Sequence, residues 1–409
     1  PRYCVVCSNV VLESEVADPT DSNIVKRVFA PTERISTYIT AVLAGEYFTV
    51  TDTYKPRSIT NSGDIPLVAY CRHSLKPHFD YDNIFRVTKN GLDFFQDLFD
   101  YPYPYPKYEQ AFVPEYNIGA MENPGLVTFT EDFIFVSGAT EDDLEGRANT
   151  ICHEMAHMWF GDLVTMKWWD DLWLKESFAD FMGALGAIEA NGFNDAWVTF
   201  ANHRKSWAYL QDQLPTTHPI VADIPHLEAA AQNFDGITYA KGASTLKQLV
   251  SYVGFDTFIE AARVYFKRFA WGNTSLQDFL DVLNEVSGRD MQTWSQAWLQ
   301  TSGLSTLGTR RVYREDGKLQ DLYLTQQLPD TQPAGIGRPH VVKLETFILQ
   351  EEKLVSTGTL SLEYPADPIA EYRVSLPQEH KKTVGEADLL MLNAEDHTYA
   401  KIMLTDEDG

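Results

Sequence analysis

Short runs of β-favouring residues separated by turn clusters occupy the first 81 residues. Residues 24–29 and 38–43 are examples of such runs, and Ala17, Asp18 and Pro19 form one of the clusters that interrupt them. Alternation of this kind predicts strands joined by tight turns. We therefore expect residues 1–81 to form a β domain.

The period of the apolar positions changes near residue 82. Apolar residues recur at helical spacing from Ile84 to Leu98, and this helix is expected to end at the proline-rich residues 101–106. Between about residue 140 and residue 300, nearly every segment has the helical period, for example residues 275–286. The pattern therefore predicts a mostly helical domain over residues 82–302.

Strand patterns return after residue 302. Asp316 and Gly317 lie between two β-rich runs, residues 311–313 and 319–324, as in a hairpin turn. We expect residues 303–409 to form a β-sandwich. Because 409 residues are too many for one hydrophobic core, the fold class is predicted to be α+β and multidomain.

Composition and charge narrow the function classes. Hydrophobic residues make up 44% of the chain, and no apolar run reaches the roughly 18 residues of a membrane span. The 58 acidic residues exceed the 33 basic ones, giving a formal net charge of -25. Such a charge repels nucleic acid and favours cationic partners, including the protonated amino end of a peptide. We expect neither a nucleic-acid nor a membrane partner.

The four cysteines are too sparse for a disulfide-built domain, so we expect reduced thiols in a cytoplasmic protein. Cys4 and Cys7 have the spacing of a redox or metal pair, but they lie in a valine-rich run. Residues three apart on a strand point to opposite faces, which argues against a shared role.

The strongest chemical signal is a pair of histidines that flank a glutamate. His153 and His157 are four residues apart with Glu154 between them. Glu176 follows after eighteen intervening residues. On a helix, residues four apart lie on one face, so both imidazoles can bind one tetrahedral metal with Glu176 as the third ligand. Three protein ligands leave a position open for water, as in catalytic zinc sites. We expect one Zn²⁺ per chain, with Glu154 taking the proton of that water.

The helical phase supports this assignment. Glu176 is expected on a further helix, where Asp180 lies one turn later and is predicted to orient a ligand histidine. At about 100° per residue, the two histidines fall roughly opposite an apolar stripe that must be buried. The stripe consists of Leu144, Ala148, Ile151, Met155 and Trp159.

The other eight histidines do not lie at the spacing of a metal-binding pair, so we interpret them as ordinary surface or core residues. They are His73, His78, His203, His218, His226, His340, His380 and His397.

A second motif precedes the histidines by some thirty residues and consists of Gly119, Ala120, Met121, Glu122 and Asn123. This run resembles the exopeptidase motif of the M1 family, the aminopeptidase N group of gluzincins. Residues 101–107, 113–114 and 234–243 also resemble M1 segments, so the similarity spans essentially the whole chain. The resemblance implies a partial N-terminal β domain, a thermolysin-like and mostly helical catalytic domain, and a C-terminal β-sandwich.

The resemblance also implies an activity, the removal of the N-terminal residue from peptides that have a free amino terminus. Glu122 would hold the substrate's ammonium group, Gly119 and Ala120 would line its backbone, and Glu154 would act as base and acid. In the family, the tyrosine at the position of Tyr239 donates a hydrogen bond to the oxyanion, and a phenol is such a donor at neutral pH. Periodicity does not distinguish Tyr239 from the other tyrosines.

The chain departs from the family pattern in two respects. The usual Asn-Glu-Gly around the third ligand is Lys175, Glu176 and Ser177 here, which keeps the ligand. The M1 N-terminal β domain is longer, and a helical domain normally follows the β-sandwich, so we expect a chain truncated at both ends. Two alternatives stay open. One is an inactive fragment or peptide-binding module of the same family, and the other is an M1 hydrolase of the leukotriene hydrolase branch, which has Gly-Gly in place of Gly119 and Ala120.

Overall fold

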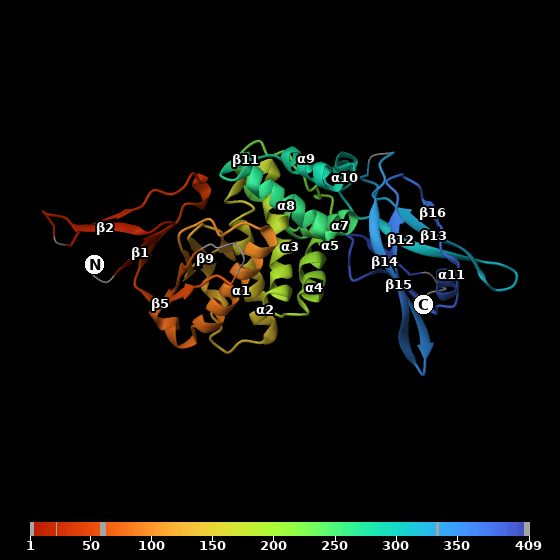
Figure 1. Ribbon diagram of the computed structural model, residues 1–409, viewed down its shortest axis with the longest axis horizontal. Helices are drawn as coiled ribbons and strands as arrows, with labels where there is room; N and C mark the ends of the chain where they lie inside the picture. Colours follow the sequence, from red (N-terminus) through yellow and green to blue (C-terminus); the bar gives the residue numbers. More distant parts are fainter. Residues whose placement is uncertain (1–3, 22, 58–62, 333–334, 405–409) are drawn as a thin grey trace. The chain divides into compact units, whose positions relative to one another are not determined.

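The protein has a mixed α/β fold with several sheets and helices (Figure 1). The structure is a computed structural model that describes residues 4–21, 23–57, 63–332 and 335–404. The chain divides into two compact units, in which unit 1 contains residues 1–167, 178–199 and 262–275 and unit 2 contains the remaining segments. Within the described ranges, no helix is long and apolar enough to cross a membrane.

Unit 1 begins with β-strands that pair into several sheets. β1 (Val5–Ser8) pairs with β4 (Val42–Gly45), and β2 (Leu12–Ala17) pairs with β3 (Val25–Phe29). A five-stranded sheet follows, in the order β5 (Tyr47–Tyr54), β6 (Ile65–Arg72), β7 (Tyr108–Val113), β9 (Leu126–Thr130) and β8 (Ala120–Met121). The edge strand β8 carries the middle of the glycine motif.

The strand predicted over residues 38–43 is wrong in its first half. Thr37–Ile39 forms a 3₁₀ helix (η1), and strand β4 starts only after it. The Asn9 side chain explains the difference, because its amide donates to the Ile39 carbonyl and its oxygen accepts from the Ala41 N–H, at 2.9 Å in each case. A side chain thus satisfies backbone groups that a neighbouring strand would otherwise pair.

The helices of unit 1 surround an aromatic core. Helix α1 (Tyr81–Phe99) confirms the helix predicted over residues 84–98. The other helices and strands of this unit are η2 (His73–His78), η3 (Glu131–Phe133), α2 (Glu141–His157), α4 (Ala196–Thr199), the parallel pair β10 (Val164–Met166) and β11 (Gly272–Thr274), and parts of α3 (Leu172–Glu189) and α8 (Phe255–Phe269). Ring centroids 5.1 to 6.2 Å apart connect the core residues Phe95, Phe99, Trp159, Phe178 and Phe266.

Unit 2 combines helices with a β-rich part. Helix α9 (Leu276–Ser287) confirms the helix predicted over residues 275–286. Two of the short helices are π-helical, η5 (Phe200–Lys205) and η6 (Ile237–Lys241). The others are η4 (Trp169–Asp171), α5 (Ser206–Gln211), α6 (Leu227–Gln232), α7 (Gly242–Val253), α10 (Met291–Trp298) and α11 (Gln378–Gly385), together with the start of α3 and of α8.

Two antiparallel-rich sheets make up the β part of unit 2. The hairpin predicted around Asp316 and Gly317 is confirmed, since β12 (Thr306–Tyr313) and β13 (Leu319–Gln327) pair antiparallel and Gly317 has a φ of 76°. One sheet has the order β16 (Glu371–Val374), β13 (Leu319–Gln327), β12 (Thr306–Tyr313) and β18 (Lys401–Met403). The other has the order β15 (Lys353–Tyr364), β14 (His340–Gln350) and β17 (Leu389–Ala394).

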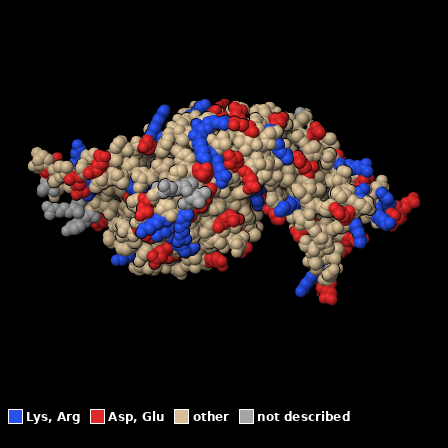
Figure 2. Space-filling model, viewed as in Figure 1, with Lys and Arg blue, Asp and Glu red and all other residues tan. Residues whose placement is uncertain are grey.

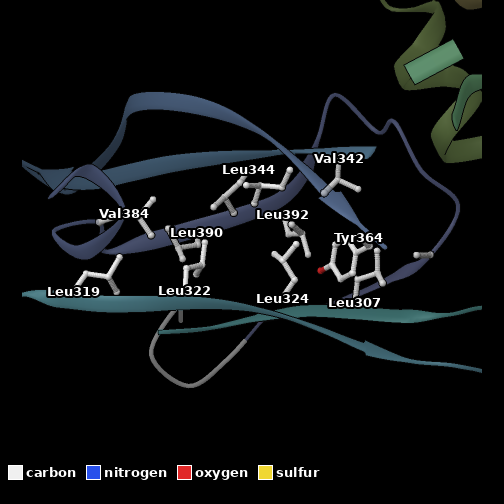
Figure 3. Packing of buried hydrophobic residues seen from close by; sticks show 13 residues of the cluster. Leu307, Leu319, Leu322, Leu324, Val342, Leu344, Tyr364, Val384, Leu390 and Leu392 are labelled. Carbon is white, nitrogen blue, oxygen red and sulfur yellow. The ribbon is translucent and has the colours of Figure 1, made fainter. Parts of the chain in front are cut away.

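The two sheets face each other across a leucine-rich core. Figure 3 shows Leu307, Leu319, Leu322 and Leu324 along one sheet, opposite side chains that come from the other. The opposite set includes Val342, Leu344, Leu390 and Leu392. Burying each such side chain stabilises the fold by about 1.5–3 kcal/mol relative to leaving it exposed, which explains why these strands alternate apolar and polar positions.

Acidic and basic side chains are intermingled on the face shown in Figure 2. Exposed ion pairs of the protein include Arg72 with Glu131 and Arg310 with Glu371, at 2.6 and 2.7 Å. Pairs of this kind contribute only about 0–1 kcal/mol each. The net charge of -25 therefore affects encounter with charged partners more than stability.

Candidate metal centre

Helix α2 begins at a locally encoded cap and buries its apolar face. Thr140 and Asp143 form a capping box, in which the Thr140 hydroxyl accepts from the Asp143 N–H at 3.1 Å and the Asp143 carboxylate accepts from the Thr140 N–H at 2.8 Å. Leu144 of the predicted stripe is half-buried. The buried members are Ala148, Ile151, Met155 and Trp159.

The ring nitrogens of the two histidines on this helix point at each other. His153 Nε2 and His157 Nε2 lie 3.2 Å apart. On the far side of each ring, His153 Nδ1 lies 3.0 Å from Asp180 Oδ1, and His157 Nδ1 lies 3.1 Å from the Phe160 carbonyl oxygen. An ionised carboxylate and a carbonyl only accept hydrogen bonds, so each Nδ1 carries the proton. When both rings are neutral, the two Nε2 lone pairs face each other, an arrangement that a shared cation stabilises.

The spacing of these atoms fits a zinc ion. Tetrahedral bonds of about 2.0–2.1 Å place two ligand nitrogens about 3.3–3.4 Å apart. Ligand atoms of His153, His157 and Glu176 all lie within 4.8 Å of one another. Both His157 and Glu176 are buried, with 1% and 3% of their surface exposed. Two neutral imidazoles and one carboxylate suit zinc and leave a coordination position open.

Glycines allow helix α3 to approach helix α2 closely. A Cβ added to Gly183 would lie 3.0 Å from the Asn149 carbonyl oxygen and 3.3 Å from the Cβ of His153. A Cβ added to Gly186 would lie 3.0 Å from the Cys152 sulfur. Asp180 precedes Gly183 by less than one helical turn. The close approach of the two helices thus sets the distance between the Asp180 carboxylate and the His153 ring.

Replacing Gly183 with leucine is expected to weaken zinc affinity by about 10- to 100-fold, the range typical of losing a group that orients a metal ligand. The larger side chain would push Asp180 away from His153, because it has no free space. Competition with a chelator at fixed pH measures the affinity. The matched control is Gly146→Leu on helix α2, where an added Cβ meets no atom within 4 Å. Equal zinc affinity in both variants would contradict the proposed effect of helix spacing.

A second group of buried side chains shares His157 with the first. Ligand atoms of Glu122, Glu154 and His157 lie within 4.8 Å of one another. Glu122 and Glu154 expose only 4% and 5% of their surface. Two carboxylates this close repel each other in a poorly hydrated site, and a nearby positive charge offsets the repulsion. This part of the site therefore favours a cationic ligand.

Pairing of β8 with β9 holds the glycine motif in place. Met121 pairs with Thr128, and the Asn123 amide donates to the Thr128 hydroxyl at 3.1 Å. Ala120 lies on the same edge strand and is half-buried. Gly119 is exposed, and an added Cβ would meet no atom within 4 Å. The structure thus leaves open space beside the first residue of the motif.

Tyr239 lies on a separate element, the π-helix η6 of unit 2. Its ring is half-buried, and the Arg204 guanidinium carbon lies 5.6 Å from the ring centroid. It is therefore placed by segments distant from the two histidines in sequence.

The prediction from sequence assigned no role to Lys175. Its Nζ lies 2.7 Å from Glu176 Oε1, and both side chains are 4% exposed. A buried ammonium group beside a buried carboxylate partly offsets the cost of desolvating both. The available signal in the sequence was the departure from the family's Asn-Glu-Gly at this position, because a lysine next to a glutamate that is expected to bind a metal brings a further positive charge to the same place.

Burial lowers the reactivity of the Cys7 thiol. All four cysteines are free. Burial, and then the charge of Glu109, raises the pKa of Cys7 to about 12. A thiol with that pKa stays protonated at neutral pH and is a poor nucleophile or metal ligand. This agrees with interpreting Cys7 as an ordinary residue.

Comparison with known proteins places the chain among peptidases. The profile described as "Peptidase family M1 domain" matches residues 84–298. The chain is 46% identical over 408 residues to the aminopeptidase N of Streptomyces lividans, covering 97% of this chain and 46% of that protein. It is 36% identical over 299 residues to the probable aminopeptidase 2 of Sulfurisphaera tokodaii, covering 73% and 37%. It is 33% identical over 276 residues to the leucyl aminopeptidase of Saccharolobus solfataricus, covering 67% and 34%. The chain thus spans less than half the length of these relatives.

Proposed function

The chain belongs to peptidase family M1, and on this premise we propose that it is a zinc-dependent aminopeptidase that hydrolyses the first peptide bond of peptides with a free amino terminus. The names of the three relatives support this proposal, since each contains the word aminopeptidase. The convergent side chains of the candidate metal centre support it independently.

The proposal assigns one zinc ion per chain to His153, His157 and Glu176, with Asp180 orienting the His153 ring. The 3.2 Å between the two Nε2 atoms supports this assignment. When bound, zinc polarises the scissile carbonyl and lowers the pKa of a water toward about 7. Removing the metal with a chelator is expected to abolish hydrolysis, and restoring zinc is expected to recover it.

The remaining steps belong to residues of the chain. The Glu154 carboxylate takes a proton from the attacking water and later gives it to the leaving amine. The Tyr239 hydroxyl donates a hydrogen bond to the oxyanion of the tetrahedral intermediate. Glu122 pairs with the substrate's ammonium group, and the other residues of its motif line the first substrate residue, namely Gly119, Ala120, Met121 and Asn123.

The observation that carries the exopeptidase assignment is the short distance between Glu122 and Glu154. A carboxylate oxygen of each lies within 4.8 Å of the other. In a peptide, the amino nitrogen and the first carbonyl carbon are only about 2.5 Å apart, given bonds of about 1.46 and 1.52 Å. A substrate whose ammonium group pairs with Glu122 therefore places its first carbonyl beside Glu154. An internal peptide would leave Glu122 desolvated without that positive charge.

Replacing Glu122 with alanine is expected to lower kcat/KM on free-amine substrates by at least about tenfold while zinc stays bound. A charge-assisted hydrogen bond contributes about 1.5–3 kcal/mol, which corresponds to roughly 10- to 150-fold. The measurement compares aminoacyl reporters and their N-acetylated forms in both enzymes. The wild type should spare acetylated substrates, and the variant should discriminate much less between the two forms.

Two other outcomes would replace the proposal. Equal cleavage of acetylated and free peptides by the wild type would indicate a thermolysin-like endopeptidase. A zinc-loaded protein that binds peptides but hydrolyses none would indicate an inactive fragment or a peptide-binding module of the same family. The inactive fragment or peptide-binding module is considered because the chain spans less than half the length of its relatives.

We also keep the predicted domains as a proposal. These are a partial N-terminal β domain over residues 1–81, a thermolysin-like domain over 82–302 and a β-sandwich over 303–409. The leucine-rich core between two sheets supports the last of these. Strand β7 lies after the predicted boundary at residue 81 but pairs with β6, which lies before it, so the five-stranded sheet contains strands from both sides of that boundary.

The four free cysteines support the expected cytoplasmic location.

A further inference from the structure

Tyr239 lies in a π-helical first turn whose N–H groups need partners from outside the helix. The π-helix η6 has only five residues. Helices of this kind are rare and occur mostly as single turns, frequently at functional sites. It leads directly into helix α7, so Tyr239 lies in the first turn of a longer helical segment. The N–H groups of a first turn have no partner inside the helix, so the shape of this turn depends on acceptors that precede it or come from other segments.

Asp235 caps the start of this π-helix. Its Oδ1 accepts hydrogen bonds from the N–H groups of Ile237 and Thr238, at 3.0 Å each. Its backbone carbonyl accepts the Tyr239 N–H at 3.1 Å. One residue thus satisfies three consecutive N–H groups that the helix itself cannot pair.

The other oxygen of this carboxylate is held from two directions. Asp235 Oδ2 accepts from His218 Nε2 at 2.7 Å and from the Gln211 amide at 2.5 Å. The second ring nitrogen of His218 lies 2.7 Å from the Pro219 carbonyl oxygen. Because both ring nitrogens face acceptors, the geometry favours the protonated imidazolium.

The electrostatics of this pair agree with its geometry. The hydrogen bond to Asp235 raises the pKa of His218, although burial opposes the shift. Burial acts to raise the pKa of Asp235, but the hydrogen bonds from His218, Thr238 and Gln211 and the charge of His218 together outweigh it, and the net pKa is lowered. Both side chains are mostly buried, with 24% and 15% exposed. Hydrogen bonds between charged groups in such surroundings are stronger than neutral ones.

Two glycines allow neighbouring side chains to reach this turn. A Cβ on Gly236 would lie 3.0 Å from Gln211 Oε1, which accepts the Gly236 N–H at 2.8 Å. A Cβ on Gly242 would lie only 1.9 Å from the Ser177 hydroxyl oxygen. That hydroxyl donates to the Thr238 carbonyl at 2.7 Å. The π-helix is therefore held at its start by Asp235 and, through Ser177, from the helix that carries Glu176.

We propose that Asp235 and His218 are positioning residues that hold the Tyr239 hydroxyl where the oxyanion forms. The inference rests on the proposed function, since it needs the oxyanion role of Tyr239. It gives a role in the reaction to His218, which is interpreted from the sequence as an ordinary residue because it does not lie at the spacing of a metal-binding pair. Neither residue needs to touch the substrate, because both act through the backbone of the π-helix.

A double-mutant cycle tests this proposal. Asp235→Ala and His218→Ala are each expected to lower kcat by about tenfold or more, with KM within about twofold, because small misplacements of a catalytic group are costly. In a Tyr239→Phe background the same substitutions should cause almost no further loss, because the hydroxyl that they position is already gone. Asp235→Asn keeps the side-chain volume and one acceptor oxygen, so it should fold even if the alanine variant does not.

The matched control is His397→Ala. His397 also pairs with a carboxylate of unit 2, that of Glu395 at 3.1 Å. This variant should keep kcat within about twofold of the wild type. If the losses of kcat add in the Tyr239→Phe background, the positioning role of Asp235 and His218 is wrong, but the oxyanion role of Tyr239 is unaffected. A wild-type kcat in Tyr239→Phe itself would overturn the oxyanion role of Tyr239 and the inference with it.

Amide hydrogen exchange supplies a measurement that does not depend on activity. The N–H groups of Ile237 and Thr238 should exchange at least about tenfold faster in Asp235→Ala and His218→Ala than in the wild type, because their acceptor is lost or released. Amides of helix α9 serve as the internal reference for global stability. Unchanged exchange at Ile237 and Thr238 would show that the pair does not hold this turn, and would overturn the inference.

Discussion

Replacing Glu154 with glutamine is expected to lower kcat by about 10²- to 10⁴-fold, the range associated with losing a general base. The amide is nearly isosteric with the carboxylate but cannot accept the proton of the attacking water. Glu154 is not one of the three proposed zinc ligands, so the variant should keep one zinc ion per chain. Steady-state kinetics on an aminoacyl reporter and elemental analysis of the same sample measure the two quantities.

Glu145→Gln is the matched control for this experiment. Glu145 lies on the same helix, about two turns before His153, and is also buried, with 6% exposed. Its replacement should leave kcat within about twofold of the wild type. A Glu154→Gln enzyme with a near-normal kcat would exclude Glu154 as the base. Loss of zinc from that variant would indicate instead that Glu154 helps to bind the metal.

Replacing Tyr239 with phenylalanine is expected to lower kcat by about 10²- to 10³-fold, the usual effect of removing one donor to an oxyanion. The ring and its contact with Arg204 are retained, because the substitution removes only the hydroxyl. KM should change little, since the hydrogen bond forms mainly in the transition state. Kinetics over a range of substrate concentrations separate the two parameters.

Tyr209→Phe provides the comparison for Tyr239→Phe. Tyr209 belongs to the same unit, and its hydroxyl donates to the Ala400 carbonyl at 2.9 Å. Removing that hydroxyl costs a structural hydrogen bond of about 0.5–1.5 kcal/mol and should not affect kcat. An unchanged kcat in Tyr239→Phe would assign oxyanion stabilisation to another group.

Local sequence patterns predicted those elements whose stability depends on their own residues. Helix α1, helix α9 and the β12–β13 hairpin follow from apolar spacing and from the turn at Asp316 and Gly317. The segment over residues 38–43 was mispredicted because its backbone partner is the side chain of Asn9, about thirty residues away. A β-favouring composition does not reveal that a distant amide will replace a neighbouring strand.

In the candidate metal centre, too, some features follow from the local sequence and others depend on distant contacts. The sequence by itself determined that His153 and His157 share one face of a helix, because residues four apart do so whatever surrounds them. It also determined that Glu154 lies between them. Both properties depend only on the helical period, which is a property of the local backbone.

Only the tertiary structure decided which distant groups meet these residues. The close packing permitted by Gly183 determines how near Asp180 lies to His153, and the edge strand β8 brings Glu122 to within 4.8 Å of Glu154. His218 gave no signal in the sequence, because its partner Asp235 is seventeen residues away and the two meet only through the fold. Contacts of this kind depend on the packing of many side chains at once, and no local period encodes them.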